Sequence, residues 1–250
     1  PSYFGEKPPD YEEICRLNQH YADIAASIQR VTEELLLGMA RHVHEQTGQK
    51  RLCIAGGVGL NSVANSRILR ETPFEEIFVQ PAAGDGGGAV GAALWAYNTL
   101  LDKPRSFRME HAYWGRSYSS AEISDFLEQN HIPHQRIEND DKLLDLVVDR
   151  IQQGKVIGWF QGRFEWGPRA LGNRSILADV RNPQMKDIVN TKIKFREPYR
   201  PFAPSVLAES AENYFELDEP MRHYPARYML LVVPIPEARR ADIQAVCHVG

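Results

Sequence analysis

The residues with the clearest chemical meaning occupy positions 158–177, where several aromatic side chains, four glycines and three arginines fall within twenty residues. Glycine lets the backbone approach a ligand closely, arginine holds anions through paired hydrogen bonds, and aromatic rings can wall a pocket. An apolar stretch with the pattern of a strand, 156–160, leads into this motif. The combination indicates a pocket for a flat or phosphorylated ligand.

The stretch that contains this motif is also the most basic part of the chain. Residues 155–205 hold ten Lys and Arg but only four Asp and Glu, within a chain whose net charge is −4. A basic island in an acidic chain suggests a local anionic ligand, since general nucleic-acid affinity favours a basic domain. We therefore expect no nucleic-acid partner, and the alternative is a solvated basic face.

Three cations of this island are candidates for catalysis. Prolines on both sides of Arg200 stiffen its backbone, and Lys194 and Arg200 together with Arg169 would form a cluster suited to a phosphate and to charge on a transferring carbonyl group. We expect Glu165 and Glu197 to orient arginines. No serine–histidine or cysteine–histidine arrangement is evident, which disfavours a covalent acyl-enzyme.

A first glycine-rich turn, 56–61, lies between an expected strand and an expected helix. Free amides and the helix dipole at such a turn can receive an anion, so Gly56, Gly57 and Asn61 are candidates for nucleotide binding. No Gly-Lys-Ser/Thr follows, so the turn is not a P-loop. The alternative is a tight turn in which Asn61 caps the helix.

A second glycine-rich stretch, 81–91, surrounds a single carboxylate. Asp85 can ligate a metal there while the amides near Gly84 and Gly86 remain available for phosphates. As a helix N-cap the aspartate would look the same. His42 and His44 would point apart on a helix and cannot chelate together, so we expect further metal ligands to come from elsewhere.

The spacing of apolar residues and the positions of glycine and proline predict an α/β chain. We expect helices at 10–48, 60–69, 89–100, 119–130, 140–153 and 185–194; strands at 51–55, 77–79, 156–160 and 228–233; and a loop at 84–88. The charged and aromatic stretch 102–116 is interpreted as a linker between two domains, 1–101 and 117–250.

The composition is that of a soluble globular protein, with 43% hydrophobic and 25% charged residues and no segment that would cross a membrane. The three cysteines are far apart, which favours buried thiols in a reduced, cytoplasmic setting. Because the chain begins at Pro1 and ends without a terminating element, we expect it to be the C-terminal part of a longer protein.

Taken together, the motifs resemble the O-carbamoyltransferase family of nodulation and antibiotic-tailoring enzymes. The matching stretches lie within 56–61, 81–87, 162–177 and 196–204. The third is long and specific, whereas the first two alone would be weak.

The resemblance implies the C-terminal half of an actin-like (ASKHA, ribonuclease H-like) domain followed by a YrdC-like domain. It implies ATP and carbamoyl phosphate as reactants, a carbamoyl-adenylate intermediate, a divalent metal (Fe, Zn, Mn or Mg), and a hydroxyl-bearing small molecule or glycan as acceptor. Asp85 then corresponds to a metal ligand. Gly56, Gly57 and Asn61 correspond to a nucleotide-contacting turn, and Arg169, Lys194 and Arg200 to residues that hold carbamoyl phosphate and the adenylate.

Two other functions are compatible with the glycine turns. An ASKHA-type kinase would need neither carbamoyl phosphate nor the motif at 158–177, and it would release ADP. A non-catalytic nucleotide-binding module would give no product. The acceptor, the identity of the metal and the oligomeric state do not follow from the sequence.

Overall fold

Two parallel strands and the helices beside them open the fold in the computed structural model, which describes residues 19–217 and 223–248. The long helix α2 (Gln19–Thr47) leads to β1 (Arg51–Ile54), the 3-10 turn η1 (Gly57–Leu60), α3 (Ser62–Glu71) and β2 (Glu76–Val79). β1 pairs with β2 from Arg51↔Glu76 to Ile54↔Val79, and α3 makes the crossover between them.

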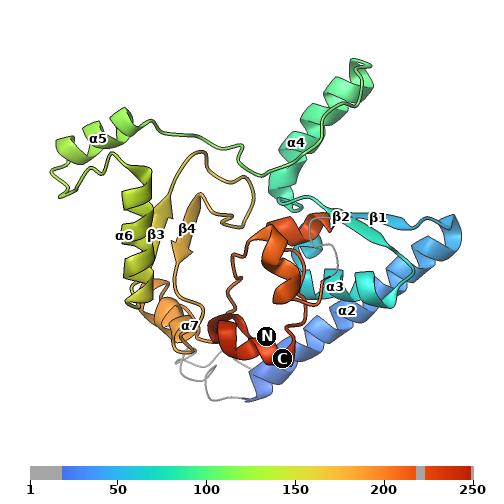
Figure 1. Ribbon diagram of the computed structural model, residues 1–250. Helices are drawn as coiled ribbons and strands as arrows, with labels where there is room; N and C mark the ends of the chain where they lie inside the picture. Colours follow the sequence, from blue (N-terminus) through green and yellow to red (C-terminus); the bar gives the residue numbers. More distant parts are fainter. Residues whose placement is uncertain (1–18, 218–222, 249–250) are drawn as a thin grey trace.

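Helices α2 and α3 cover one face of this small sheet (Figure 1). Leu37 of α2, Ile68 of α3 and Ile77 of β2 form the apolar core between them, because burying these side chains removes their surface from water. Arg67 of α3 ties the two helices together through Glu33, with Nη1 and Oε2 2.8 Å apart. On the opposite face, Phe78 remains 42% exposed.

The helix that follows β2 projects away from the rest of the molecule at the top of Figure 1. It consists of α4 (Asp85–Trp95), continued by the π-helical turn η2 (Ala96–Leu100), and none of its residues is buried. Residues 102–116 then run without helix or strand, yet Ala112 is 1% exposed.

The next part of the chain contains an antiparallel strand pair. α5 (Ser120–Gln129) and α6 (Asp140–Gln152) precede β3 (Ile157–Phe160) and β4 (Arg174–Leu177), which pair from Ile157↔Leu177 to Phe160↔Arg174. α7 (Met185–Ile188) and the π-helical turn η3 (Val189–Ile193) follow beyond the end of β4.

The C-terminal segment consists of the 3-10 helices η4 (Ala208–Asn213), η5 (Tyr224–Tyr228) and η6 (Glu237–Val246). It returns to the first strand pair, where Tyr228 and Leu230 pack with Val79 and Ala112. Asn65 of α3 donates from Nδ2 to the carbonyl of Leu230 at 3.1 Å. The division into domains at 101 and 117 stays a prediction.

The α/β class and most of the expected elements are confirmed, including the capping box of Ser119 and Glu122. Two expectations are wrong: most of 84–88 belongs to α4, which begins at Asp85, and 228–233 is not a strand. Met229 has a φ of 57°, which breaks an extended run at that point. β4 was not expected, and the start of the helix expected from residue 10 lies outside the described residues.

Candidate active site

The two glycine-bearing turns meet at the carboxyl ends of β1 and β2. The amide of Gly56, whose φ is 103°, donates to the carbonyl of Ala83 at 2.8 Å. A Cβ built on Gly84 would lie 3.6 Å from Cα of Gly57, and one on Gly87 would overlap the Gln80 amide. The two turns, predicted separately from the sequence, are therefore in contact. They can be, because the carboxyl ends of neighbouring parallel strands lie at the same edge of the sheet.

Asn61 lies at the base of this surface and caps α3. Its Oδ1 accepts from the amide of Ala64 at 3.1 Å, and its Nδ2 donates to Oε1 of Gln29 at 3.0 Å. Both ends of the side-chain amide thus have protein partners, as the alternative considered above describes. Gly86 lies in the first turn of α4, where an added Cβ would be 3.8 Å from that of Ala82.

Asp85 is the first residue of α4, and its side chain is exposed beside the joined turns. It can supply a carboxylate oxygen to a cation. Across residues 19–217 and 223–248, however, no group of three or more His, Cys, Asp or Glu side chains is placed to hold a metal ion. The described residues therefore offer one candidate ligand and do not by themselves fit a complete metal centre.

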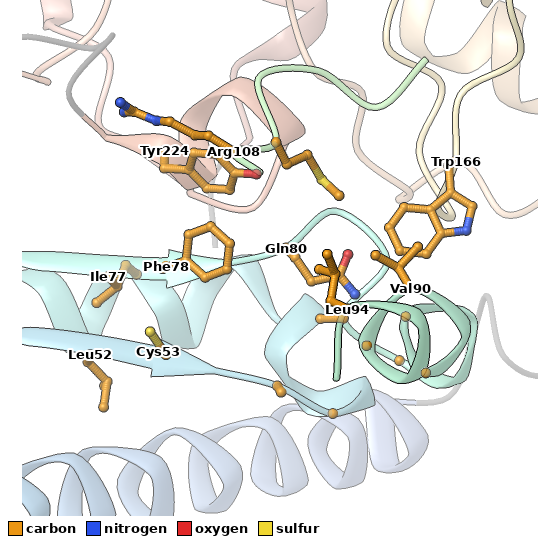
Figure 2. A pocket seen from close by; sticks show the side chains of 18 of the residues that line it. Leu52, Cys53, Ile77, Phe78, Gln80, Val90, Leu94, Arg108, Trp166 and Tyr224 are labelled. Carbon is orange, nitrogen blue, oxygen red and sulfur yellow. The ribbon is translucent and has the colours of Figure 1, made fainter. Parts of the chain in front are cut away.

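A cavity of about 1060 Å³ opens between the free face of the β1–β2 sheet, the start of α4 and the segments 107–109 and 223–224. Gly56, Gly84 and Asp85 line it. At one end the rings of Phe78 and Tyr224 lie 4.6 Å apart, with Arg108 beside them (Figure 2). Burial raises the pKa of the Tyr224 hydroxyl, which keeps it neutral.

Several residues that line the cavity were missed from the sequence. Arg108 and its neighbours lie in the stretch interpreted as a linker, and Tyr224 lies in the stretch before the expected last strand. Cys53, expected to be a buried thiol, is exposed at this cavity. No local motif marks these residues, because tertiary packing brings them to the glycine turns.

The motif at 158–177 reaches the same place. Trp166 lines the cavity near Val90 of α4 (Figure 2), and its backbone amide donates to the carbonyl of Ala112 at 2.6 Å. Gly167, with a φ of 118°, lies so close to the second glycine turn that an added Cβ would be 2.8 Å from the Pro81 carbonyl oxygen. This contact joins the third motif to the turn that leads into Asp85.

Within the motif, Glu165 holds backbone rather than an arginine side chain, which corrects the expectation. Its Oε1 accepts from the amides of Leu171 at 2.7 Å, Asn173 at 2.8 Å and Arg174 at 3.2 Å. Burial alone would raise the pKa of Glu165, but these hydrogen bonds outweigh it and hold the pKa below its usual value. The carboxylate is therefore ionised at neutral pH.

The three candidate cations lie on two segments of the chain, and their grouping into one cluster stays a prediction. Arg169 lies in the loop between β3 and β4, and its Nε is buried without a partner among the described residues. Lys194 and Arg200 follow η3 in the chain. Both are exposed, and Arg200 pairs with Glu197 at 2.6 Å, an expected arginine–glutamate contact that is confirmed.

Asn190 holds the segment that carries Arg200. It is completely buried, its Nδ2 donates to the carbonyls of Pro198 at 3.1 Å and Arg200 at 2.9 Å, and its Oδ1 accepts from Nε of Arg196 at 2.7 Å. A buried amide with every polar atom satisfied stiffens the backbone it touches. The hydrogen bonds of buried Asn190 therefore fix the backbone of the segment that carries Lys194 and Arg200.

Comparison with known families accounts for both groups of motifs. The family model described as carbamoyltransferase N-terminus matches residues 9–94, and the one described as carbamoyltransferase C-terminus matches residues 148–250. The chain belongs to the carbamoyltransferase family. The first match spans both glycine turns, and the second spans the loop of Arg169 and the segment of Asn190, so each group of motifs lies within one of the two matched regions.

Named relatives agree with this assignment. The chain is 45% identical over 234 residues to nodulation protein NolNO of Sinorhizobium fredii and 42% identical over 231 residues to nodulation protein NolO of Bradyrhizobium diazoefficiens; each alignment covers 92% of the chain. It is 34% identical over 198 residues, 79% of the chain, to a 3'-hydroxymethylcephem-O-carbamoyltransferase of Streptomyces clavuligerus. The chain spans 34%, 42% and 34% of the lengths of these three relatives.

Proposed function

We propose that this chain is part of an ATP-dependent O-carbamoyltransferase that transfers a carbamoyl group to a hydroxyl of a small molecule or glycan. The observation that carries the proposal is the contact of Gly167 with Pro81, which joins the long family motif to the glycine turns and Asp85. The relative named for 3'-hydroxymethylcephem supports a hydroxyl acceptor, because its name specifies O-carbamoylation.

We further propose that the first part is the C-terminal half of an actin-like domain and that the second part is YrdC-like. The parallel pair β1 and β2 with glycine turns at its carboxyl ends supports the first assignment.

None of the described helices is both long and apolar enough to cross a membrane. Cys53 and Cys247 are both free thiols, which supports the proposed cytoplasmic setting.

In the proposed reaction, carbamoyl phosphate loses its phosphate to water and leaves carbamate. A carbamate oxygen attacks the α-phosphorus of ATP and releases pyrophosphate, which gives carbamoyl-adenylate. The acceptor hydroxyl then attacks the carbonyl carbon, loses its proton and releases AMP. The second step brings two anions together, and the other two develop negative charge on oxygen, so all three barriers fall when fixed cations and backbone amides face that charge.

This chain offers two places for those groups. The joined glycine turns present amides beside the cavity, and Arg169 lies in the loop that contacts them, so we assign Gly56, Gly57, Gly84 and Gly86 to phosphate contacts of the nucleotide. Lys194 and Arg200 form a second basic segment, which we assign to carbamoyl phosphate. Asp85 is the one candidate metal ligand that the described residues contribute to this site, so a divalent metal there would need ligands from elsewhere.

Product analysis tests the proposal. The natural polypeptide that contains this chain is incubated with ATP, with and without carbamoyl phosphate, and the nucleotides and phosphates are resolved by chromatography. We expect pyrophosphate that depends on carbamoyl phosphate, and AMP once an acceptor alcohol is added. ADP without carbamoyl phosphate would instead identify a kinase, and binding of ATP without any product would identify a nucleotide-binding module.

A further inference from the structure

The loop between β3 and β4 closes on a single carboxylate oxygen. Oε1 of Glu165 accepts three backbone amides, from Leu171, Asn173 and Arg174, at 2.7, 2.8 and 3.2 Å. Hydrogen bonds to an ionised acceptor are about twice as strong as those between neutral groups. Glu165 therefore fixes the returning half of the loop that carries Arg169.

The same loop is braced from its other side by an arginine. The Arg174 guanidinium lies over the rings of Phe160 at 3.6 Å and Phe164 at 4.0 Å, and its Nη2 donates to the carbonyl of Gly162 at 3.0 Å. Tyr113 adds a hydrogen bond from its hydroxyl to the Leu171 carbonyl at 2.8 Å. With these groups in place, the conformation of residues 161–174 is set largely by internal contacts.

The residues directly after Glu165 carry this conformation to the neighbouring turn. Trp166 donates to the Ala112 carbonyl at 2.6 Å, and Gly167 lies against the Pro81 carbonyl. Pro81 is buried, and three residues separate it from Asp85. A shift of the loop at Glu165 must therefore displace either this contact or the turn that precedes Asp85.

We propose that Glu165 is a positioning residue. Its carboxylate holds the 161–174 loop so that Gly167 packs against the turn at Pro81. This contact fixes the position of Arg169 relative to that of Asp85. Glu165 touches no reactant in this role. Its effect on the reaction rests on the proposed function, but its effect on the two segments does not.

Hydrogen exchange measured by mass spectrometry tests the structural part on the full chain. Glu165→Gln keeps an acceptor at Oε1, Glu165→Asp withdraws the oxygens by one methylene while keeping the charge, and Glu165→Ala removes them. The control is Glu138→Ala, which breaks an exposed ion pair with Arg136 and should change nothing.

We expect the Asp and Ala variants to speed exchange at the amides of 171–174 and also at those of 82–88, and the Gln variant, which keeps a neutral acceptor, to exchange at rates between those of the Ala variant and the wild type. Faster exchange confined to 171–174 would overturn the proposal, because the loop would then not hold the second turn. A Gln variant as fast as the Ala variant would also overturn it. Should Glu165→Ala fail to fold, the Asp and Gln pair decides the question.

Kinetics on the natural polypeptide separate positioning from a general loss of structure. Glu165→Asp should lower kcat for pyrophosphate formation by about 10²-fold, as a misplaced catalytic group does, with little change in the KM for ATP and partial recovery of the rate in Glu165→Gln. Equal rates in the Asp variant and the wild type would contradict the catalytic part. If the wild type forms no pyrophosphate, the proposed function fails, and the exchange data still decide the role of Glu165.

Discussion

Replacement of Gly167 by alanine tests the contact on which the candidate site depends. Gly167 has a φ of 118°, a conformation that L-residues rarely adopt. An added Cβ would lie 2.8 Å from the Pro81 carbonyl oxygen and 3.1 Å from its carbon, both of them backbone atoms. The neighbour therefore cannot rotate away, as the end of a flexible side chain could.

Two effects determine how much Gly167→Ala lowers the free energy of unfolding. A non-glycine residue in such a backbone conformation costs about 1–3 kcal/mol. Overpacking against a fixed neighbour costs about 1–3 kcal/mol more. We therefore expect Gly167→Ala to lower the free energy of unfolding by about 2–6 kcal/mol, unless part of that cost is released by separation of the loop from the turn at Pro81.

Urea unfolding of the wild type and Gly167→Ala measures this difference, and Gly158→Ala is the matched control, since a Cβ on Gly158 meets nothing within 4 Å. Hydrogen exchange at 82–88 in the same variants detects separation of the two segments. A Gly167→Ala protein that matches the control in both stability and exchange would refute the contact, and with it the convergence of the motifs.

Further predictions concern three other residues. Asn190→Ala should lower the free energy of unfolding in urea by about 2–4 kcal/mol, because the carbonyl of Arg200 and the guanidinium of Arg196 lose their partner; a loss no larger than that of the same substitution at the exposed Asn213 would contradict it. The folded-state pKa of Glu165 lies below its unfolded value, so its stabilisation is complete above the unfolded pKa and is lost as the pH falls through the folded one. Urea titrations between pH 7 and 3 should accordingly show a shallower loss of stability in Glu165→Gln, and identical slopes would contradict the hydrogen bonds. Asp85→Asn should leave stability unchanged but lower the divalent-metal content of the natural polypeptide, measured by elemental analysis, whereas full metal content would exclude Asp85 as a ligand.

Elements whose signals are local were predictable from the sequence. The capping box of Ser119 and Glu122 places the start of α5 because both partners lie within one turn. Apolar periodicity identifies α2 and α6, and short apolar runs identify β1 and β2. The glycine turns could be located for the same reason, since a glycine cluster between a strand and a helix is a local pattern.

The start of α4 and the residues after Tyr228 required tertiary information. Three glycines in succession disfavour a helix by propensity, yet Gly87 is the residue that fits against the Gln80 amide, so packing overrides the local preference. The run at 228–233 is as apolar as a strand, but Met229 turns the chain and the amide of Val232 donates to Oγ of Ser66 at 2.6 Å instead of to a strand.

The candidate site likewise has features that local sequence predicts and features that depend on tertiary packing. Its motifs could be recognised, and the approach of the 158–177 motif to the glycine turns could not, because it depends on the contact of Gly167 with a carbonyl 86 positions earlier in the chain. The cluster of Arg169 with Lys194 and Arg200 was expected from their shared basic stretch. Along the chain, β4, α7 and η3 lie between Arg169 and the other two cations, so their grouping depends on tertiary packing that no local pattern encodes.

The central claim is that the 158–177 motif and the glycine turns build one site, which holds the nucleotide while carbamoyl-adenylate forms. Its most direct test compares carbamoyl-phosphate-dependent pyrophosphate release by Arg169→Ala with that by Arg181→Ala, a control whose guanidinium pairs with Asp179 at 2.7 Å. We predict that Arg169→Ala lowers the rate by about 10²–10³-fold, as loss of one charge-stabilising donor does, and that the control keeps the wild-type rate. Equal rates in Arg169→Ala, Arg181→Ala and the wild type would contradict the account.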